Sequence, residues 1–165
     1  IVQEVVKAGG FLHGHTYVAN PLSCAIANAV LKEMIDEDLM KNASEAGAYL
    51  KTELINLAKQ SLIIGDVRGK GLLLAIEIVK DKQSKALLEA QVRAVYRILE
   101  IGIEEGILLY TRKTAAGAFG EWIMVTPALT ITKAQVDELV KLLTKTIFLF
   151  EKELKDGGFL NTSKE

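Results

Sequence analysis

The sequence predicts an α+β fold in which helices pack on a mostly antiparallel sheet of about four strands, with a long helix ahead of them. Several long segments carry apolar residues at the spacing of one helix face. Between them lie short runs of branched apolar residues, bounded by glycine or proline, which are typical of strands. Half of the 165 residues are hydrophobic and a quarter are charged, so the chain can form an ordinary folded core.

The long helix ahead of the sheet has a well-marked start. Residues 1–17 form an irregular lead-in, after which Asn20 is a good N-cap. Pro21 suits the first helical position, where no amide hydrogen is needed. Over residues 22–35 apolar side chains occupy most of the helix surface, so we expect this helix to be buried nearly all round. A chain of this size has difficulty covering such a helix alone, which indicates that further protein covers it.

The next segments predict a helix followed by a hairpin. Residues 39–59 carry leucines and alanines spaced for one helix face. Two short arms rich in branched apolar residues, 61–68 and 72–79, flank a turn at residues 69–71. Glycines at both ends of that turn permit a positive φ, which a tight hairpin requires.

The middle of the chain predicts one more helix and two more strands. An amphipathic pattern indicates a helix over residues 86–105. A strand over 107–111, a loop of glycine and alanine over 112–121 and a strand over 122–126 follow it. Pro127 ends the last of these strands.

The last helix is predicted to open with a capping box formed by Thr132 and Gln135. The tail beyond it carries few apolar residues at helical spacing, so we expect it to be frayed. We therefore divide the chain into a leading segment 1–35, a domain 36–156 and a tail 157–165.

Charge and composition exclude several classes of function. The 20 basic and 21 acidic residues give no electrostatic case for a nucleic acid or an anionic membrane as partner. No apolar run reaches the roughly 18 to 20 residues that a membrane span needs, so we expect no membrane partner. The single Cys24 excludes an internal disulfide and fits a reducing compartment, which predicts a cytoplasmic location.

Few residues offer reactive chemistry. His13 and His15 could share an ion on an extended segment, but no third histidine exists and Cys24 lies on a helix, so we predict no metal site. Cys24 stands among apolar residues, where cysteine behaves as a small hydrophobe rather than a nucleophile. Thr16 follows Gly14, which lets the backbone approach an anion, and offers a hydroxyl and an amide to phosphate oxygens. The residue types around Thr16 are compatible both with an anion-binding site and with an ordinary loop ahead of the helix.

Three motifs in the right order resemble the signatures of class III aminotransferases. In that family a His-Gly-x-Thr-Tyr/Phe segment precedes a Pro-Leu/Val-Ala/Ser-Cys helix, a VRGxGL hairpin is followed by a glutamate, and a PPLxIT segment leads to an aspartate. The matching stretches here are 10–17 with 19–25, 67–72 with Glu77, and 127–132 with Asp137. Together they cover nearly the whole chain, which makes the resemblance more specific than any single motif.

The resemblance implies a fold-type I enzyme that uses pyridoxal 5'-phosphate and works as a homodimer with active sites at the subunit interface. Thr16, with His15 beside it, would bind the phosphate of the cofactor held by the neighbouring subunit. The helix from Pro21 would connect the large and small domains, and residues 36–156 would be the small C-terminal domain, packed on its own large domain. The whole enzyme would transfer an amino group between an amine or amino acid and a keto acid.

The chain departs from the family where the catalytic lysine is concerned. The lysine that forms the Schiff base lies upstream of the His-Gly-x-Thr motif, and no lysine here matches it. We therefore assign no catalytic residue to this chain and expect it to be inactive alone.

Met124 stands where several members carry a carboxylate-binding arginine, whereas Arg112 lies near the position of the mobile loop arginine of other members. Arg112 is thus a candidate substrate-binding residue or a solvated loop residue. The alternative function is a truncated, non-catalytic module that dimerises or binds partners.

Overall fold

The computed structural model describes residues 1–11, 13–113 and 120–160, and the chain divides into two compact units, Ile1–Asp38 and Leu39–Glu165. The first unit contains helices α1 (Val2–Lys7) and α2 (Pro21–Asp36), so the lead-in expected to be irregular includes a short helix. The start of α2 is as predicted, because the Asn20 side chain accepts a hydrogen bond of 3.1 Å from the amide of Ser23.

The surroundings of α2 differ from the expectation. No residue of this helix is buried, and Leu22 at its start is 70 % exposed. The described residues of the first unit therefore do not provide the expected burial on all sides. The apolar pattern itself is as predicted, since Leu22, Ile26 and Ile35 are all exposed apolar residues of α2.

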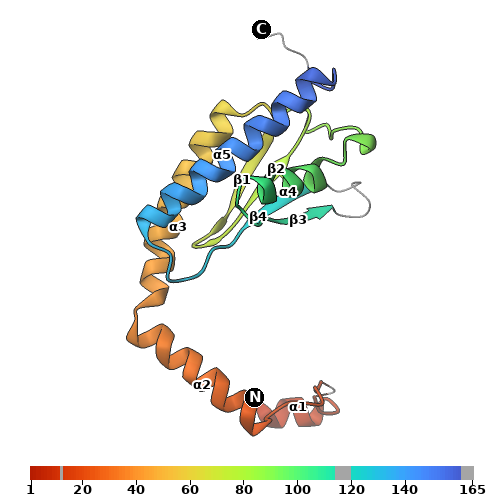
Figure 1. Cartoon of the computed structure of the whole chain (residues 1–165). Helices are drawn as coiled ribbons and strands as arrows, with labels where there is room; N and C mark the ends of the chain where they lie inside the picture. Colours follow the sequence, from red (N-terminus) through yellow and green to blue (C-terminus); the bar gives the residue numbers. More distant parts are fainter. Residues whose placement is uncertain (12, 114–119, 161–165) are drawn as a thin grey trace. The chain divides into compact units, whose positions relative to one another are not determined.

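The second unit is built on an antiparallel sheet of four strands, which confirms the predicted fold class. In Figure 1 the strands are β1 (Ile64–Lys70), β2 (Leu73–Ile78), β3 (Tyr110–Lys113) and β4 (Glu121–Val125), in the spatial order β1-β2-β4-β3. Strands β1 and β2 form the predicted hairpin, with Lys70 opposite Leu73. The turn is therefore at Gly71 and Leu72 rather than at residues 69–71, and Gly71 has the positive φ of 54°.

Three α-helices complete the described part of this unit, and one of them begins later than predicted. The helices are α3 (Leu39–Gln60), α4 (Ala94–Glu104) and α5 (Lys133–Asp156). The predicted helix over 86–105 begins only at Ala94, after a short 3-10 turn, η1 (Ala90–Val92), although Leu88 and Val92 still pack on the core as the amphipathic pattern requires.

The strand predicted over 107–111 begins at Tyr110 and continues to Lys113. Arg112 therefore lies on a strand opposite Trp122, and not in the predicted loop. Pairing with β4 overrides the weak local signal of this segment. Most of the predicted loop, residues 114–119, lies outside the described residues.

The end of the chain is anchored further than expected. Thr132 and Gln135 form the predicted capping box at the start of α5. Beyond α5 the amide of Phe159 donates to the carbonyl oxygen of Leu154 at 2.8 Å, and Leu160 is only 8 % exposed. Residues 157–160 are thus a packed turn rather than a frayed tail, because two apolar side chains after the glycines reach back to the core. Residues 161–165 lie outside the described part of the chain.

The core lies between one face of the sheet and the helices. Figure 1 shows α3 and α5 running alongside each other over the strands, with α4 beside them. Alternate residues of β2 and β4, such as Ile76 and Ile123, are fully buried against these helices. The opposite face of the sheet is left open: Leu73 is 61 % exposed and Tyr110 is 51 % exposed. Residues pointing to that open face are accessible within this unit.

Candidate functional site

The segment before α2 presents His15 and Thr16 at the surface of the first unit. Both residues are exposed, and a tight turn follows, in which the amide of Val18 donates to the carbonyl oxygen of His15 at 3.0 Å. The rings of His13 and His15 meet edge to face with centroids 4.8 Å apart. The chain then enters α2 through the Asn20 cap.

This turn has the donors that a phosphate group needs. Threonine supplies a hydroxyl and an amide, and an imidazole beside it can donate as well. None of the hydrogen bonds found among the described residues uses the hydroxyl or the amide of Thr16. The residues present therefore fit an anionic group with several oxygens, provided that another surface supplies the rest of its ligands.

The open face of the sheet carries the third predicted site residue, Arg112. Strand alternation places Arg112 and Tyr110 on this face of β3. The register places Trp122 opposite Arg112 and Met124 opposite Tyr110 on β4. Sequence reasoning did not assign Trp122 a role, because the strand register that joins it to Arg112 is a property of the tertiary structure.

The guanidinium of Arg112 lies beside aromatic and apolar groups. Its Cζ is 5.8 Å from the centre of the Tyr110 ring, a distance at which a cation and an aromatic ring attract. Tyr110 and Met124 in turn line an apolar hollow of about 420 Å³ at the end of the sheet. His15 and Thr16 belong to the first unit, and Arg112 belongs to the second.

The hairpin motif contributes an ion-pair network to the same open face. Nη1 of Arg68 donates to Oδ2 of Asp66 at 2.7 Å, and its Nη2 lies 3.7 Å from Oε1 of Glu77. The hydrogen bond from Arg68 holds the pKa of Asp66 below its ordinary value. The arginine and the glutamate of the motif are thus cross-strand partners, which gives Arg68 a structural role in the hairpin.

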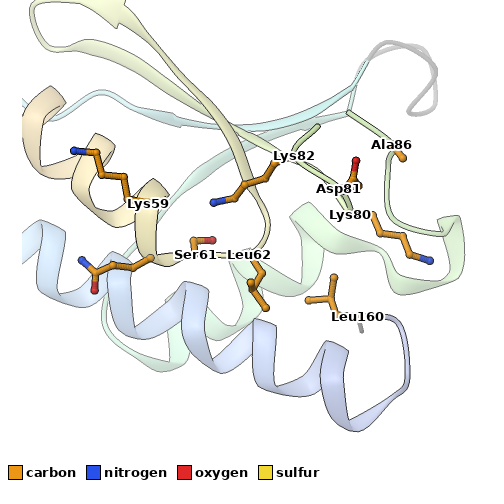
Figure 2. Close-up of a pocket in the computed structure, with 9 residues that line it drawn as sticks. Lys59, Ser61, Leu62, Lys80, Asp81, Lys82, Ala86 and Leu160 are labelled. Atoms are coloured by element: carbon orange, nitrogen blue, oxygen red, sulfur yellow. The ribbon is translucent and has the colours of Figure 1, made fainter. Parts of the chain in front are cut away.

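Another hollow, of about 1000 Å³, lies at the far end of α3 and is drawn in Figure 2. Two of the three lysines that line it, Lys80 and Lys82, have partners within the fold. Lys82 donates to the carbonyl oxygen of Ala58 at 2.5 Å, and Lys80 pairs with Glu89 at 2.5 Å. Figure 2 shows these two amines pointing in opposite directions. Burial lowers the pKa of Lys82. Because Lys80 and Lys82 already have partners, this hollow offers a weaker ligand site than the open face of the sheet.

Within residues 1–11, 13–113 and 120–160, no group of three or more His, Cys, Asp and Glu side chains is arranged to hold a metal ion. Across the same ranges, none of the helices is both long enough and apolar enough to cross a membrane. Cys24, the single cysteine, is exposed on α2.

The fold and the sequence match one class of protein. Residues 1–147 match the family model for class-III aminotransferases. The chain is 35 % identical over 155 residues to the uncharacterized aminotransferase YodT of Bacillus subtilis, covering 92 % of this chain and 35 % of that protein. It is 36 % identical over 153 residues to the ornithine aminotransferase of Plasmodium falciparum, covering 93 % of this chain and 33 % of the relative.

Solved structures agree with the sequence comparison. A transaminase from the marine bacterium Virgibacillus matches with a TM-score of 0.80 at 26 % identity, over 92 % of this chain and 34 % of that structure. An amine transaminase from an uncultivated Pseudomonas species, in its PLP-bound form, matches with a TM-score of 0.72 at 32 % identity, over 84 % of this chain and 30 % of that structure.

These matches define a transaminase fold. The chain belongs to the class-III aminotransferase family. It spans about a third of the length of the relatives it matches.

Proposed function

We propose that this chain supplies the C-terminal part of a pyridoxal-phosphate-dependent aminotransferase, which transfers an amino group between an amine or amino acid and a keto acid. The observation that carries the proposal is the family match over residues 1–147, at about a third of the length of the relatives. The Schiff-base lysine is assigned to protein outside these 165 residues, because no lysine here stands in the family's position. The single cysteine favours a cytoplasmic location for this enzyme.

The cofactor would supply an electron sink for the carbanion that forms on the substrate. This chain would contribute ligands for its phosphate. The exposed hydroxyl and amide of Thr16 and the imidazole of His15 present donors to such a group. A single turn cannot enclose a phosphate, so the remaining ligands are assigned to a second subunit, consistent with a homodimer.

Arg112 is proposed to bind the carboxylate of the substrate. It is exposed on the open face of the sheet, and among the described residues it has no carboxylate partner, whereas Arg68 and Lys113 are paired with Asp66 and Glu121. A planar guanidinium can hold a carboxylate through two parallel hydrogen bonds. Its binding would orient the substrate and leave the reacting end to groups outside this chain.

The apolar surface of α2 is proposed to be covered by the large domain of the same enzyme. Leu22, Ile26 and Ile35 are each more than half exposed, which a folded protein rarely leaves uncovered over one helix. This assignment makes α2 the connector between the two domains.

Two measurements test the proposal. First, the intact mass of the natively produced protein should be roughly 45 to 50 kDa, the size of the relatives. Second, that protein should catalyse transamination with added cofactor, while the 165-residue chain of 18.0 kDa should not. Turnover by the short chain alone would show that the lysine assignment is wrong. A native species of 18.0 kDa would favour the non-catalytic module instead.

A further inference from the structure

Lys82 lies at the far end of α3, where it lines two neighbouring hollows. One is the hollow of about 1000 Å³ drawn in Figure 2, and the other has a volume of about 440 Å³. The side chain is half-buried, and its Nζ donates to the carbonyl oxygen of Ala58 at 2.5 Å, in the last turn of α3. The last four carbonyl groups of a helix have no partner within the helix, so Lys82 satisfies one of them.

The surroundings of the Lys82 amine favour its neutral form. Burial lowers the pKa of Lys82, the carboxylate of Glu151 on α5 opposes this effect, and the like charge of Lys85 adds to it. Lys59 on α3 and Asp66 on β1 line the smaller hollow with it. Because the net direction is downward, a larger share of this amine is neutral and nucleophilic at a given pH than of an ordinary exposed lysine.

The lining of the larger hollow favours an anionic reagent. Its charged residues are three lysines and one aspartate, namely Lys59, Lys80, Lys82 and Asp81. Asp81 accepts hydrogen bonds from the amide and the hydroxyl of Ser84, and Lys80 pairs with Glu89. Within residues 1–11, 13–113 and 120–160, Lys59 and Lys82 form no salt bridge. The positive charge that remains attracts small anions to the hollow.

We propose that Lys82 is a site of covalent acylation by small acyl phosphates. The neutral amine attacks the carbonyl carbon of the acyl phosphate, and a C–N bond forms as the C–O bond to the phosphate group breaks. Inorganic phosphate leaves with the electron pair of that bond, and the amine releases one proton to water. The amide product keeps an N–H that can donate to the carbonyl oxygen of Ala58, and the hollow of about 1000 Å³ has room for the acyl group. This inference goes beyond the proposed transamination and does not rest on it.

Mass spectrometry of the acetylated chain tests the proposal. The folded 165-residue chain is incubated with acetyl phosphate at mildly alkaline pH and denatured, and its remaining amines are then blocked with deuterated acetic anhydride. The ratio of light to heavy acetyl groups gives the initial rate at each lysine. Lys51 is the matched control, because its Nζ also donates to a backbone carbonyl oxygen, that of Gly69 at 3.2 Å, but it lines neither hollow. Lys82 should react about threefold or more faster than Lys51.

Two further comparisons separate the effect of the fold from that of the reagent. In urea the difference between Lys82 and Lys51 should disappear, because the burial and the neighbouring charges are lost. The pH profile of the Lys82 rate should also level off at a lower pH in the folded chain than in urea. Lys59→Gln should slow the reaction of Lys82 with acetyl phosphate about twofold, and should leave its reaction with the uncharged N-hydroxysuccinimidyl acetate unchanged.

Equal rates at Lys82 and Lys51 in the folded chain would overturn the inference, and so would a difference that persists in urea. A preference for Lys82 that is seen only with the uncharged reagent would reject acyl phosphates as the donor class. Faster acetylation of Lys82 by acetyl phosphate, lost in urea and reduced in Lys59→Gln, supports the proposal. Because these rates are measured without turnover, the outcome is independent of transaminase activity in the native protein.

Discussion

The hydroxyl of Tyr49 on α3 donates a hydrogen bond of 2.5 Å to Oδ1 of Asp137 on α5. The ammonium of Lys133 lies 4.9 Å from the centre of the same tyrosine ring. Asp137 is the aspartate of the third family motif, so the structure gives that motif position a role within this chain. The hydrogen bond between Tyr49 and Asp137 joins α3 and α5, the two long helices that cover the sheet.

Tyr49→Phe should make the stability of the chain less dependent on alkaline pH. The hydrogen bond to Asp137 raises the pKa of Tyr49 from 10.0 to about 12. Because the folded-state pKa is the higher one, the contribution of this bond is fully present below pH 10.0 and is lost as the pH rises through about 12. Denaturant unfolding at several pH values should show the wild-type chain more stable than Tyr49→Phe at pH 7, with the difference shrinking in that window. Tyr96→Phe, at an exposed tyrosine on α4, should show no such convergence.

Gly47→Ala should destabilise the second unit by about 1–3 kcal/mol. A Cβ at position 47 would lie 2.2 Å from the carbonyl carbon of Gly71. Relieving this clash requires a shift of the backbone of α3 or of the hairpin turn, which costs free energy. The helix propensity gained by alanine, about 1 kcal/mol, acts in the opposite direction and is the smaller effect. Urea unfolding measures the change. Gly14→Ala is the control, because a Cβ there meets nothing within 4 Å; an equal or larger loss there would contradict this account.

Ser61→Ala should cost about 2–3 kcal/mol. Glu151 is only 4 % exposed, and its Oε1 accepts hydrogen bonds from the Ser61 hydroxyl at 2.6 Å and the Leu62 amide at 2.7 Å. The Ser61 oxygen also accepts from the amides of Ile63 and Ile64. Removing the Ser61 hydroxyl takes one hydrogen-bond partner from each of three groups: the Glu151 carboxylate and the amides of Ile63 and Ile64. Ser44→Ala, at an exposed position of α3, should change the free energy of unfolding by less than about 0.5 kcal/mol.

Thr16→Ala should weaken cofactor binding by about tenfold or more in the whole enzyme of the proposed function, since a hydrogen bond to a charged phosphate is lost. Thr16→Ser keeps the hydroxyl and should retain most of the affinity. Absorbance titration of the apo-enzyme with pyridoxal phosphate gives the constants. His13→Ala is the matched control in the same segment. If Thr16→Ala binds the cofactor as tightly as His13→Ala does, Thr16 is not a phosphate ligand.

The sequence predicted well those elements whose signals are local. The Asn20 cap, the Thr132–Gln135 capping box and the β1–β2 hairpin each depend on a few adjacent residues, and the structure has them. The predicted start of the helix after residue 86 was wrong, because the apolar residues Leu88 and Val92 do pack on the core but lie ahead of the α-helix, Val92 within a 3-10 turn. Periodicity reports which side chains are buried and not which backbone buries them.

The sequence predicted some features of the candidate site, and the tertiary structure supplied the others. Sequence motifs alone pointed to His15, Thr16 and Arg112, because the residue types and their order resemble a known family. The relation of Arg112 to Tyr110, Trp122 and the apolar hollow depends on a strand register that no local signal encodes.

The sequence by itself therefore determined the family, the α+β class and the capped helix ends, since these follow from residue type and spacing along the chain. Only the tertiary structure decided that Arg112 lies on strand β3 and that Phe159 and Leu160 return to the core. It also decided which face of the sheet is open. Each of these depends on contacts between residues far apart in the chain, whose free energy is gained only once the whole unit has assembled.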